Sequence, residues 1–260
     1  MSRRRPRPSR LAPNPSGVHL LHSPTVLRQL VAGTAPGSLV VDLGAGPGTI
    51  TAALAARGAS VLAIERDPRF AAVLRRRFAD QPRVRVVEAD LRRARLPARA
   101  RVVANPPFAL STLLLRRLLG GSGPPHPGAD LLVEHGFARR ATAAAGAESA
   151  WWAARHELRL LRPVAPSAFA PPPRVAAAHL RIRPRPPLPP AEERALRALV
   201  VLAHGRPRSA RAVAVEVLGA RRGPRTLRAL GVDGGAPART VPVSAWRAAV
   251  RPVAGAAPRR

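Results

Sequence analysis

The 260-residue chain contains no cysteine, no lysine and no tyrosine, and only 14 of its residues are acidic. The absence of cysteine excludes disulfides, thiolate metal sites and a cysteine nucleophile. The seven histidines are scattered without the spacing of metal ligands, so we expect no metal. No run of 18 apolar residues occurs, and the first residues lack the apolar stretch of a signal peptide. We therefore expect a cytoplasmic protein without a membrane segment.

Arginine is what the chain has in excess. All 44 basic residues are Arg, and the formal net charge is +30. The use of Arg in place of Lys, with abundant Ala and Pro, is typical of a GC-rich genome, so part of the excess is mutational. That bias does not explain the shortage of acids, and a charge of this sign and size attracts nucleic acid. Candidate phosphate contacts lie at 3–10, 92–101, 139–140 and 206–225, although each cluster is equally compatible with a solvated face.

Strand and helix patterns alternate over most of the chain, which predicts βαβ units around a parallel sheet. We expect strands at 38–42, 60–65, 84–88, 101–104, 129–133, 158–161 and 175–183, and helices at 24–31, 49–57, 67–78 and 110–119. A Pro-rich segment follows, and further helices are expected at 191–203, 209–220 and 244–250. We predict a disordered basic tail at 1–15, an α/β domain at 16–183 and a small helical region at 184–260. The length suits one such domain in a monomer.

The first motif is a Gly-rich turn that follows a buried strand, in the segment VVDLGAGPG at 40–48. Without Cβ atoms, Gly44 and Gly46 allow a ligand to approach the backbone at the start of a helix. The dinucleotide fingerprint needs its third glycine one residue later than Gly48. The spacing instead matches the S-adenosylmethionine loop of Rossmann-like methyltransferases. The alternative is a tight turn that binds nothing.

Two acidic residues follow the next two strands. Glu65 ends the strand at 60–65, where a carboxylate can accept hydrogen bonds from both hydroxyls of a ribose. Asp90 comes just after the strand at 84–88, where it could accept a hydrogen bond from the amine of an adenine. Either acid could also be a solvated residue at the end of a strand. Their order after the Gly-rich turn favours the ligand-binding interpretation.

The segment Ala104-Asn-Pro-Pro-Phe108 follows a fourth strand and is the most specific of these motifs. An amine on an aromatic ring is a poor nucleophile because its lone pair is delocalised. The Asn105 side-chain oxygen and a nearby backbone carbonyl can accept both of its N–H groups and direct the lone pair at a methyl donor. Pro106 and its neighbour stiffen the loop, and Phe108 can stack on a flipped base. The alternative is a Pro-containing turn with a core Phe.

In this order the motifs resemble those of the rRNA adenine dimethyltransferases, which include the small-subunit dimethyladenosine transferases and the erythromycin-resistance methylases. The resemblance covers about residues 16–183, and its most specific part is the segment FAPPPRV at 169–175. It implies an α/β Rossmann-like fold, S-adenosyl-L-methionine as cofactor and ribosomal RNA as partner. It makes Asn105 a residue shared between cofactor and target, and it places Phe169 over the other face of the target adenine. His19 and Leu21 would meet the methionine part of the cofactor, with His19 standing where the family has Asn.

The short Arg-rich C-terminal region resembles the erythromycin-resistance branch more closely. This implies methylation of the exocyclic amine of an adenine in 23S rRNA, with resistance to macrolides, lincosamides and streptogramin B. Dimethylation of 16S rRNA in ribosome maturation and a non-catalytic RNA-binding factor are the alternatives. DNA adenine, protein glutamine and small-molecule methyltransferases are less well supported, because the first two lack the 169–175 segment and the third would not need the charge.

Overall fold

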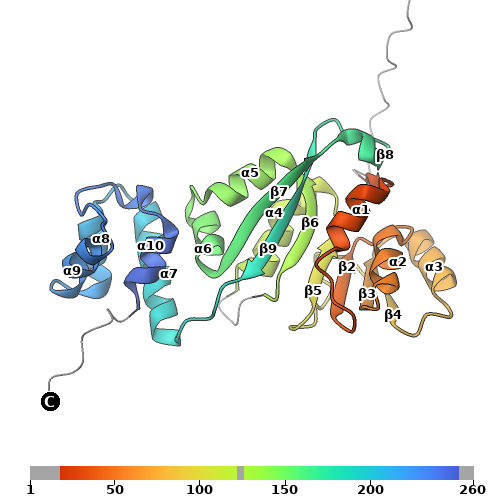
Figure 1. Ribbon diagram of the computed structural model, residues 1–260, viewed down its shortest axis with the longest axis horizontal. Helices are drawn as coiled ribbons and strands as arrows, with labels where there is room; N and C mark the ends of the chain where they lie inside the picture. Colours follow the sequence, from red (N-terminus) through yellow and green to blue (C-terminus); the bar gives the residue numbers. More distant parts are fainter. Residues whose placement is uncertain (1–17, 122–125, 252–260) are drawn as a thin grey trace, which may run out of the picture.

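The computed structural model describes residues 18–121 and 126–251, so the tail predicted at 1–15 and the arginines at 3–10 lie outside the described residues. A seven-stranded sheet with the strand order β4-β3-β2-β5-β6-β9-β7 forms the centre (Figure 1). The strands are β2 (Leu39–Leu43), β3 (Ser60–Glu65), β4 (Val84–Glu88), β5 (Arg101–Ala104), β6 (Ala129–Glu134), β7 (His156–Val164) and β9 (Ala177–Pro184). Neighbours among β4, β3, β2, β5 and β6 are parallel, whereas β9 runs antiparallel to both β6 and β7. The prediction of a parallel sheet is therefore wrong for this edge.

Helices cover both faces of the sheet. One face carries α1 (Pro24–Val31), α2 (Thr49–Ala56) and α3 (Pro68–Arg77), whose apolar side chains form clusters with β2, β3 and β5. The other face carries α4 (Ser111–Leu119), α5 (His135–Ala143) and α6 (Ala147–Arg155). Ser23 caps α1 and Asp67 caps α3, and Pro is the first helical residue of both helices.

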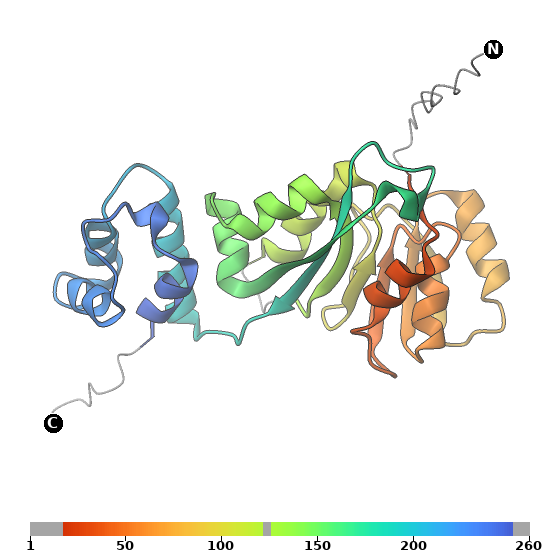
Figure 2. The same ribbon diagram turned by 45° about the horizontal axis from the view of Figure 1, so that its top comes forward.

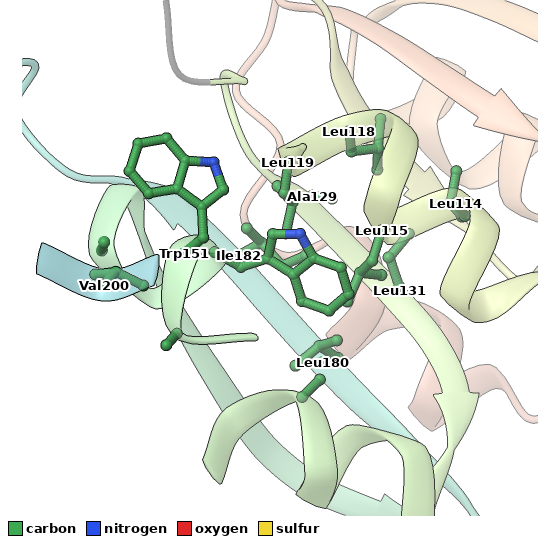
Figure 3. Packing of buried hydrophobic residues seen from close by; sticks show 14 of the residues in the cluster. Leu114, Leu115, Leu118, Leu119, Ala129, Leu131, Trp151, Leu180, Ile182 and Val200 are labelled. Carbon is green, nitrogen blue, oxygen red and sulfur yellow. The ribbon is translucent and has the colours of Figure 1, made fainter. Parts of the chain in front are cut away.

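The larger part of the core lies on the α4–α6 face of the sheet. In Figure 3, leucines of α4 lie close to the strand residues Leu131, Leu180 and Ile182, all of which are fully buried. Residues 129–133 of β6 are buried on both faces, which explains why this strand reads as an almost continuous apolar run. In β9, by contrast, apolar and polar side chains alternate, because only one of its faces packs on this core.

Between β9 and Arg251 the chain forms four α-helices, which lie at one end of the molecule, away from α1–α3 (Figure 2). They are α7 (Pro190–His204), α8 (Ala210–Leu218), α9 (Arg222–Ala229) and α10 (Val243–Ala249). Both α7 and α10 pack on α6, and Arg155 pairs with Glu193 at 2.7 Å across this junction. The helical character predicted here is confirmed, whereas the limits of the domains stay a prediction.

The sequence patterns missed several elements. They are the helices α5, α6 and α9 and the two-residue strands β1 (Leu20–Leu21) and β8 (Phe169–Ala170), which pair antiparallel with each other. Alanine occupies many positions of α5 and α6, so apolar and polar residues do not alternate with a clear helical period. Strands of two residues are too short to produce a pattern at all.

Gly48 has the most restricted surroundings of the three glycines in the turn after β2. Its φ is +86°, and a Cβ atom there would lie 2.7 Å from Leu74 Cδ2 and 2.8 Å from Phe78 Cε2. We expect Gly48→Ala to lower the free energy of unfolding by about 2–4 kcal/mol, from backbone strain and overpacking together. Urea denaturation measures this, with Gly37→Ala as the control. Gly37 has φ +74° but no atom within 4 Å of the added Cβ, so equal losses in the two variants would contradict the packing argument.

Candidate functional site

A cavity of about 350 Å³ opens at the carboxyl edge of the parallel strands, where ligands of open α/β sheets commonly bind. Its walls come from the turn after β2, the end of β3, the residues that follow β4 and β5, and the N-terminal segment 18–21. All seven cofactor-binding residues predicted from the sequence line this one cavity: His19, Leu21, Gly44, Gly46, Glu65, Asp90 and Asn105. The fold therefore brings together residues that lie up to 86 positions apart.

The Gly-rich turn forms one wall of the cavity. Gly44 and Gly46 have φ values of +73° and +54°, in the left-handed region that side chains disfavour. A Cβ on Gly46 would lie 3.3 Å from Leu20 Cδ2, so a larger residue would press on the N-terminal segment across the cavity. Gly44 and Gly46 shape the cavity, whereas Gly48 serves the packing of α3.

Glu65 is held rigidly at the end of β3. Its Oε2 accepts a hydrogen bond from the Gly46 amide at 2.8 Å, and its Oε1 accepts from the amides of Arg66 and Asp67 at 2.7 and 2.8 Å. The carboxylate thus ties the Gly-rich turn to the start of α3. Since a carboxylate accepts about four hydrogen bonds, roughly one acceptor position stays open toward a ligand. The prediction that Glu65 accepts from both ribose hydroxyls stays a prediction.

Asp90 lines the cavity with its carboxylate fixed by arginine. Arg92 donates hydrogen bonds to both of its oxygens, and Arg66 lies 4.0 Å from Oδ2. The hydrogen bonds from Arg92, and then the charges of both arginines, lower the pKa of Asp90 to about 2. The group is therefore an ionised acceptor at neutral pH.

Asn105 stands where the loop after β5 meets the N-terminal segment. Its Nδ2 donates a 2.7 Å hydrogen bond to the backbone oxygen of His19. A carbonyl can only accept, so this contact fixes which end of the amide is which and leaves Oδ1 as an acceptor. The His19 ring nitrogen Nδ1 lies 2.8 Å from the carbonyl oxygen of Pro171. His19 therefore connects the 105–108 loop with the 169–173 segment.

The aromatic residues predicted to hold the target do not line the cavity. The rings of Phe108 and Phe169 lie 6.4 Å apart at 86°, edge against face, and Phe169 is only 2% exposed. Two perpendicular rings leave no slot for a base between them, so a sandwich of the adenine would require the Phe169 ring to turn. The Phe108 ring is half-buried, 5.9 Å from the His19 ring. Pro106, within the same loop, is buried.

The sequence analysis missed two features of this site. One is the pairing of Leu20 with Ala170 and of Leu21 with Phe169, which places the N-terminal segment against the 169–173 segment over the cavity. The other is Asp42, a fully buried carboxyl group at the end of β2 that accepts a 2.7 Å hydrogen bond from the Thr51 hydroxyl. Its position inside the Gly-rich motif was the available signal for Asp42.

Burial raises the pKa of Asp42 to about 7 against the lowering effect of the Thr51 hydrogen bonds. Between about pH 4 and 7, Asp42 is therefore protonated in the folded state and ionised in the unfolded state. Its contribution to the free energy of unfolding falls as the pH rises through this range. Asp42→Asn should therefore gain stability over the parent chain by up to about 4 kcal/mol between pH 4 and 7. Urea denaturation across this range measures the difference. A difference independent of pH would contradict the prediction. The comparison between variants cancels the titration of the half-buried His126 and the buried His156, whose pKa values desolvation lowers to about 4.

The arginine clusters expected to contact phosphate divide into two kinds. Arg101 is held internally, since it donates to Asp130 and to the Gly33 carbonyl, and phosphate binding by this residue stays a prediction. Arg92 donates hydrogen bonds to Asp90, and Arg222 donates to three carbonyls at the end of α10. Other members are exposed, and for them phosphate binding stays a prediction: Arg93, Arg95, Arg99, Arg139, Arg140, Arg206, Arg211, Arg221 and Arg225. In the part of the chain that the structure describes, no helix could span a membrane and no three His, Asp or Glu side chains group as metal ligands would.

The residues of the cavity suit S-adenosylmethionine. Glu65 and Asp90 contribute carboxylate oxygens to the lining, which suit the hydroxyls and the amine of an adenosine, and Ile64, Phe70 and Leu91 contribute apolar surface that suits its base. The glycine turn leaves the backbone accessible to the methionine portion. The volume falls within the range of cavities that bind small cofactors.

Comparison with known proteins places this geometry in a family. Residues 15–204 match the model of the family described as ribosomal RNA adenine dimethylase. An rRNA adenine N-6-methyltransferase of Bacillus licheniformis is 30% identical over 66% of this chain and 61% of its own length. A ribosomal RNA small subunit methyltransferase A of Synechococcus sp. (strain JA-3-3Ab) is 37% identical over 68% and 69%. This chain thus spans less than two thirds of the Bacillus relative.

Among solved structures, the 23S rRNA methyltransferase ErmE superposes with a TM-score of 0.76 and 26% identity. The superposition covers 89% of this chain and 98% of ErmE, so it includes the helical region after β9. The Rossmann-like methyltransferase fold with a helical C-terminal region, expected from the motifs, is confirmed. The chain belongs to the ribosomal RNA adenine dimethylase family.

Proposed function

We propose that this protein transfers a methyl group from S-adenosyl-L-methionine to the exocyclic amine of an adenine in ribosomal RNA, with 23S rRNA as the first candidate. The observation that carries the proposal is the orientation of Asn105 at the cavity. Its Nδ2 is used by the His19 carbonyl, so its Oδ1 is the end that can accept from a substrate N–H. The family of the chain and its likeness to ErmE support the same reaction.

The bound cofactor would supply a methyl group on a sulfonium, which an amine nitrogen can attack in line without help from a base. The protein contributes position and the exclusion of water. Asn105 Oδ1 and a backbone carbonyl of the loop, with that of Pro106 as the candidate, accept from the amine and direct its lone pair. Phe108 lies beside this point and can stack on the base. The amine loses its proton only after it has gained the methyl group.

The cofactor residues follow from the cavity. Glu65 would accept from a ribose hydroxyl, Asp90 from the adenine amine, and the segment with His19 and Leu21 would cover the methionine portion. The target adenine has to leave its stack, which costs a few kcal/mol and is easiest in a loop or bulge. We expect the protein to act as a monomer in the cytoplasm, where its rRNA substrate is made.

The choice between the two rRNAs rests on two different likenesses. The superposition on the 23S rRNA methyltransferase ErmE covers almost the whole length of that protein. This likeness favours 23S rRNA as the substrate and a role in resistance to macrolides, lincosamides and streptogramin B. The Synechococcus small-subunit methyltransferase has the higher identity, which keeps 16S rRNA as the second candidate.

Purified protein incubated with methyl-labelled S-adenosylmethionine and either protein-free 23S or 16S rRNA tests this proposal, with primer extension to locate the label. We expect label at one adenine of 23S rRNA, with a stop of the reverse transcriptase if two methyl groups are added. Label on 16S rRNA would assign the protein to ribosome maturation. Cofactor binding without label on either RNA would overturn the proposed substrate.

A further inference from the structure

The face of the strands β9 and β7 that points away from α5 and α6 is partly open in the part of the chain that the structure describes, whereas the same face of β6 packs against α1. The helices that pack on β7 and β9 within residues 126–251 are α5 and α6, and their apolar contacts are with Leu158, Leu160, Leu180 and Ile182. Residues opposite one another in an antiparallel pair point to the same face. The register therefore places three rows of paired residues on the other face. They are Asp130–Arg181–Arg159, Arg183–Glu157 and His179–Arg162. In Figure 1, α1 and α2 do not extend over β7 and β9.

Positive charge dominates this partly open face. Asp130 is buried and accepts from Arg101 and Arg181 at 2.6 and 2.8 Å, with the Arg183 guanidinium at 3.7 Å. One carboxylate thus faces three guanidiniums. On β7, Glu157 pairs with Arg159, and Arg162 is exposed with no acidic partner in the part of the chain that the structure describes. We name this surface the arginine face; its arginines are Arg101, Arg159, Arg162, Arg181 and Arg183.

The five arginines of the arginine face meet two carboxylates, Asp130 and Glu157, which leaves an excess of three positive charges. Strands rise about 3.3 Å per residue, so the strip from Glu157 to Arg162 is about 15 Å long. At one end it reaches Val164, where β7 leads into the segment that carries Phe169. A guanidinium recognises phosphate with paired N–H donors, and Arg181 and Arg101 are already held in place by Asp130.

We propose that the arginine face binds the phosphate backbone of the substrate RNA and extends the contact from the cavity down the sheet. The proposal rests on the proposed function, since it assumes an RNA substrate. RNA fits better than an acidic protein, because the arginines form a continuous strip without exposed apolar side chains between them. Asp130 keeps the guanidiniums of Arg101 and Arg181 in position, the part-buried Arg183 lies beside them, and the exposed Arg162 makes the outermost contact.

RNA binding by the double variant Arg162→Gln/Arg183→Gln tests this proposal without relying on methyl transfer. The affinity for an in vitro transcript of 23S rRNA is measured between 50 and 300 mM salt. Two lost phosphate contacts should weaken binding about 10- to 30-fold near 100 mM salt and reduce the slope of log affinity against log salt by about 1.5. The matched control is Arg76→Gln/Arg85→Gln, which removes the same charge from exposed positions on α3 and β4.

The outcomes separate this proposal from the proposed function. Unchanged affinity and slope in the first double variant, with RNA still methylated, would overturn the arginine face alone. An equal loss in the control would show an effect of net charge and would overturn it as well. Wild-type protein that binds RNA through this face but labels neither rRNA would overturn the proposed function alone. Arg162→Lys/Arg183→Lys should keep most of the affinity, which excludes a folding defect as the cause.

The absence of cysteine allows a direct localisation. A single Arg162→Cys residue can carry an iron–EDTA group, whose radicals cleave RNA nearby. We expect cleavage of the bound 23S transcript from position 162 and none above background from Arg76→Cys. No cleavage from position 162, or the same cleavage from both, would contradict the proposal.

Discussion

Replacement of Asn105 by Ala should reduce methyl transfer about 1000-fold, whereas the lost hydrogen bond to His19 should weaken cofactor binding by only about tenfold. The reason is that Oδ1 is a preorganised acceptor at the point where the amine develops positive charge, and the loss of one such group costs about 100- to 1000-fold in comparable sites. The loss of position of the substrate adds to this. Single-turnover transfer of label to rRNA measures the rate, and calorimetry with the cofactor measures binding.

Two companions of Asn105→Ala sharpen the result. Asn105→Asp keeps an acceptor but places a carboxylate against the His19 carbonyl, which now receives no hydrogen bond. It should be almost as slow as the Ala variant. Gln81→Ala removes an exposed amide from the turn between α3 and β4 and should have no effect. A rate within tenfold of wild type for Asn105→Ala would show that the backbone of the loop positions the amine without this side chain.

The part of the site that could be predicted from the sequence consists of the residues that directly follow the parallel strands. Parallel strands bring their carboxyl ends to one edge, so Gly44, Glu65, Asp90 and Asn105 could be expected together although they are far apart in the chain. The structure places all of them on one cavity. Their individual hydrogen bonds were not predictable, because the three amides on Glu65 depend on how the chain turns after β3.

The antiparallel direction of β9, at the edge formed by β9 and β7, could not be predicted from the sequence. The strand at 175–183 alternates apolar and polar residues, which indicates one open face but does not fix the direction of the strand. The relative orientation of Phe108 and Phe169 depends on packing between the 169–173 segment and the N-terminal residues, which are 150 positions apart. Spacing along the sequence carries no information about such an angle.

The arginine content shows the same limit. Codon bias places Arg wherever a basic residue is tolerated, so a cluster in the sequence did not distinguish bound from exposed guanidiniums. Arg101 lies in a cluster predicted to contact phosphate and donates to Asp130. Arg162 lies in no predicted cluster and is exposed on the arginine face. Only the pairing of strands shows which arginines share a surface.

Glu65→Gln should weaken cofactor binding about 100-fold. The substitution removes a charged acceptor for the cofactor, and hydrogen bonds to charged groups contribute about 1.5–3 kcal/mol. It also turns an N–H donor toward one of the three amides that the carboxylate now accepts from, which should loosen the Gly-rich turn. Calorimetry with S-adenosylmethionine measures the affinity, and thermal unfolding without cofactor measures the structural part.

Glu88→Gln is the matched control for this variant. Glu88 lies opposite Glu65 in the register of β3 and β4, at the end of the neighbouring strand, but it is exposed, pairs with Arg75 and does not line the cavity. An exposed pair of this kind contributes less than about 1 kcal/mol, so cofactor affinity should stay within twofold. If both variants bound the cofactor as tightly as wild type, the ribose would have to be held by other groups, and Glu65 would serve only to tie the Gly-rich turn to α3.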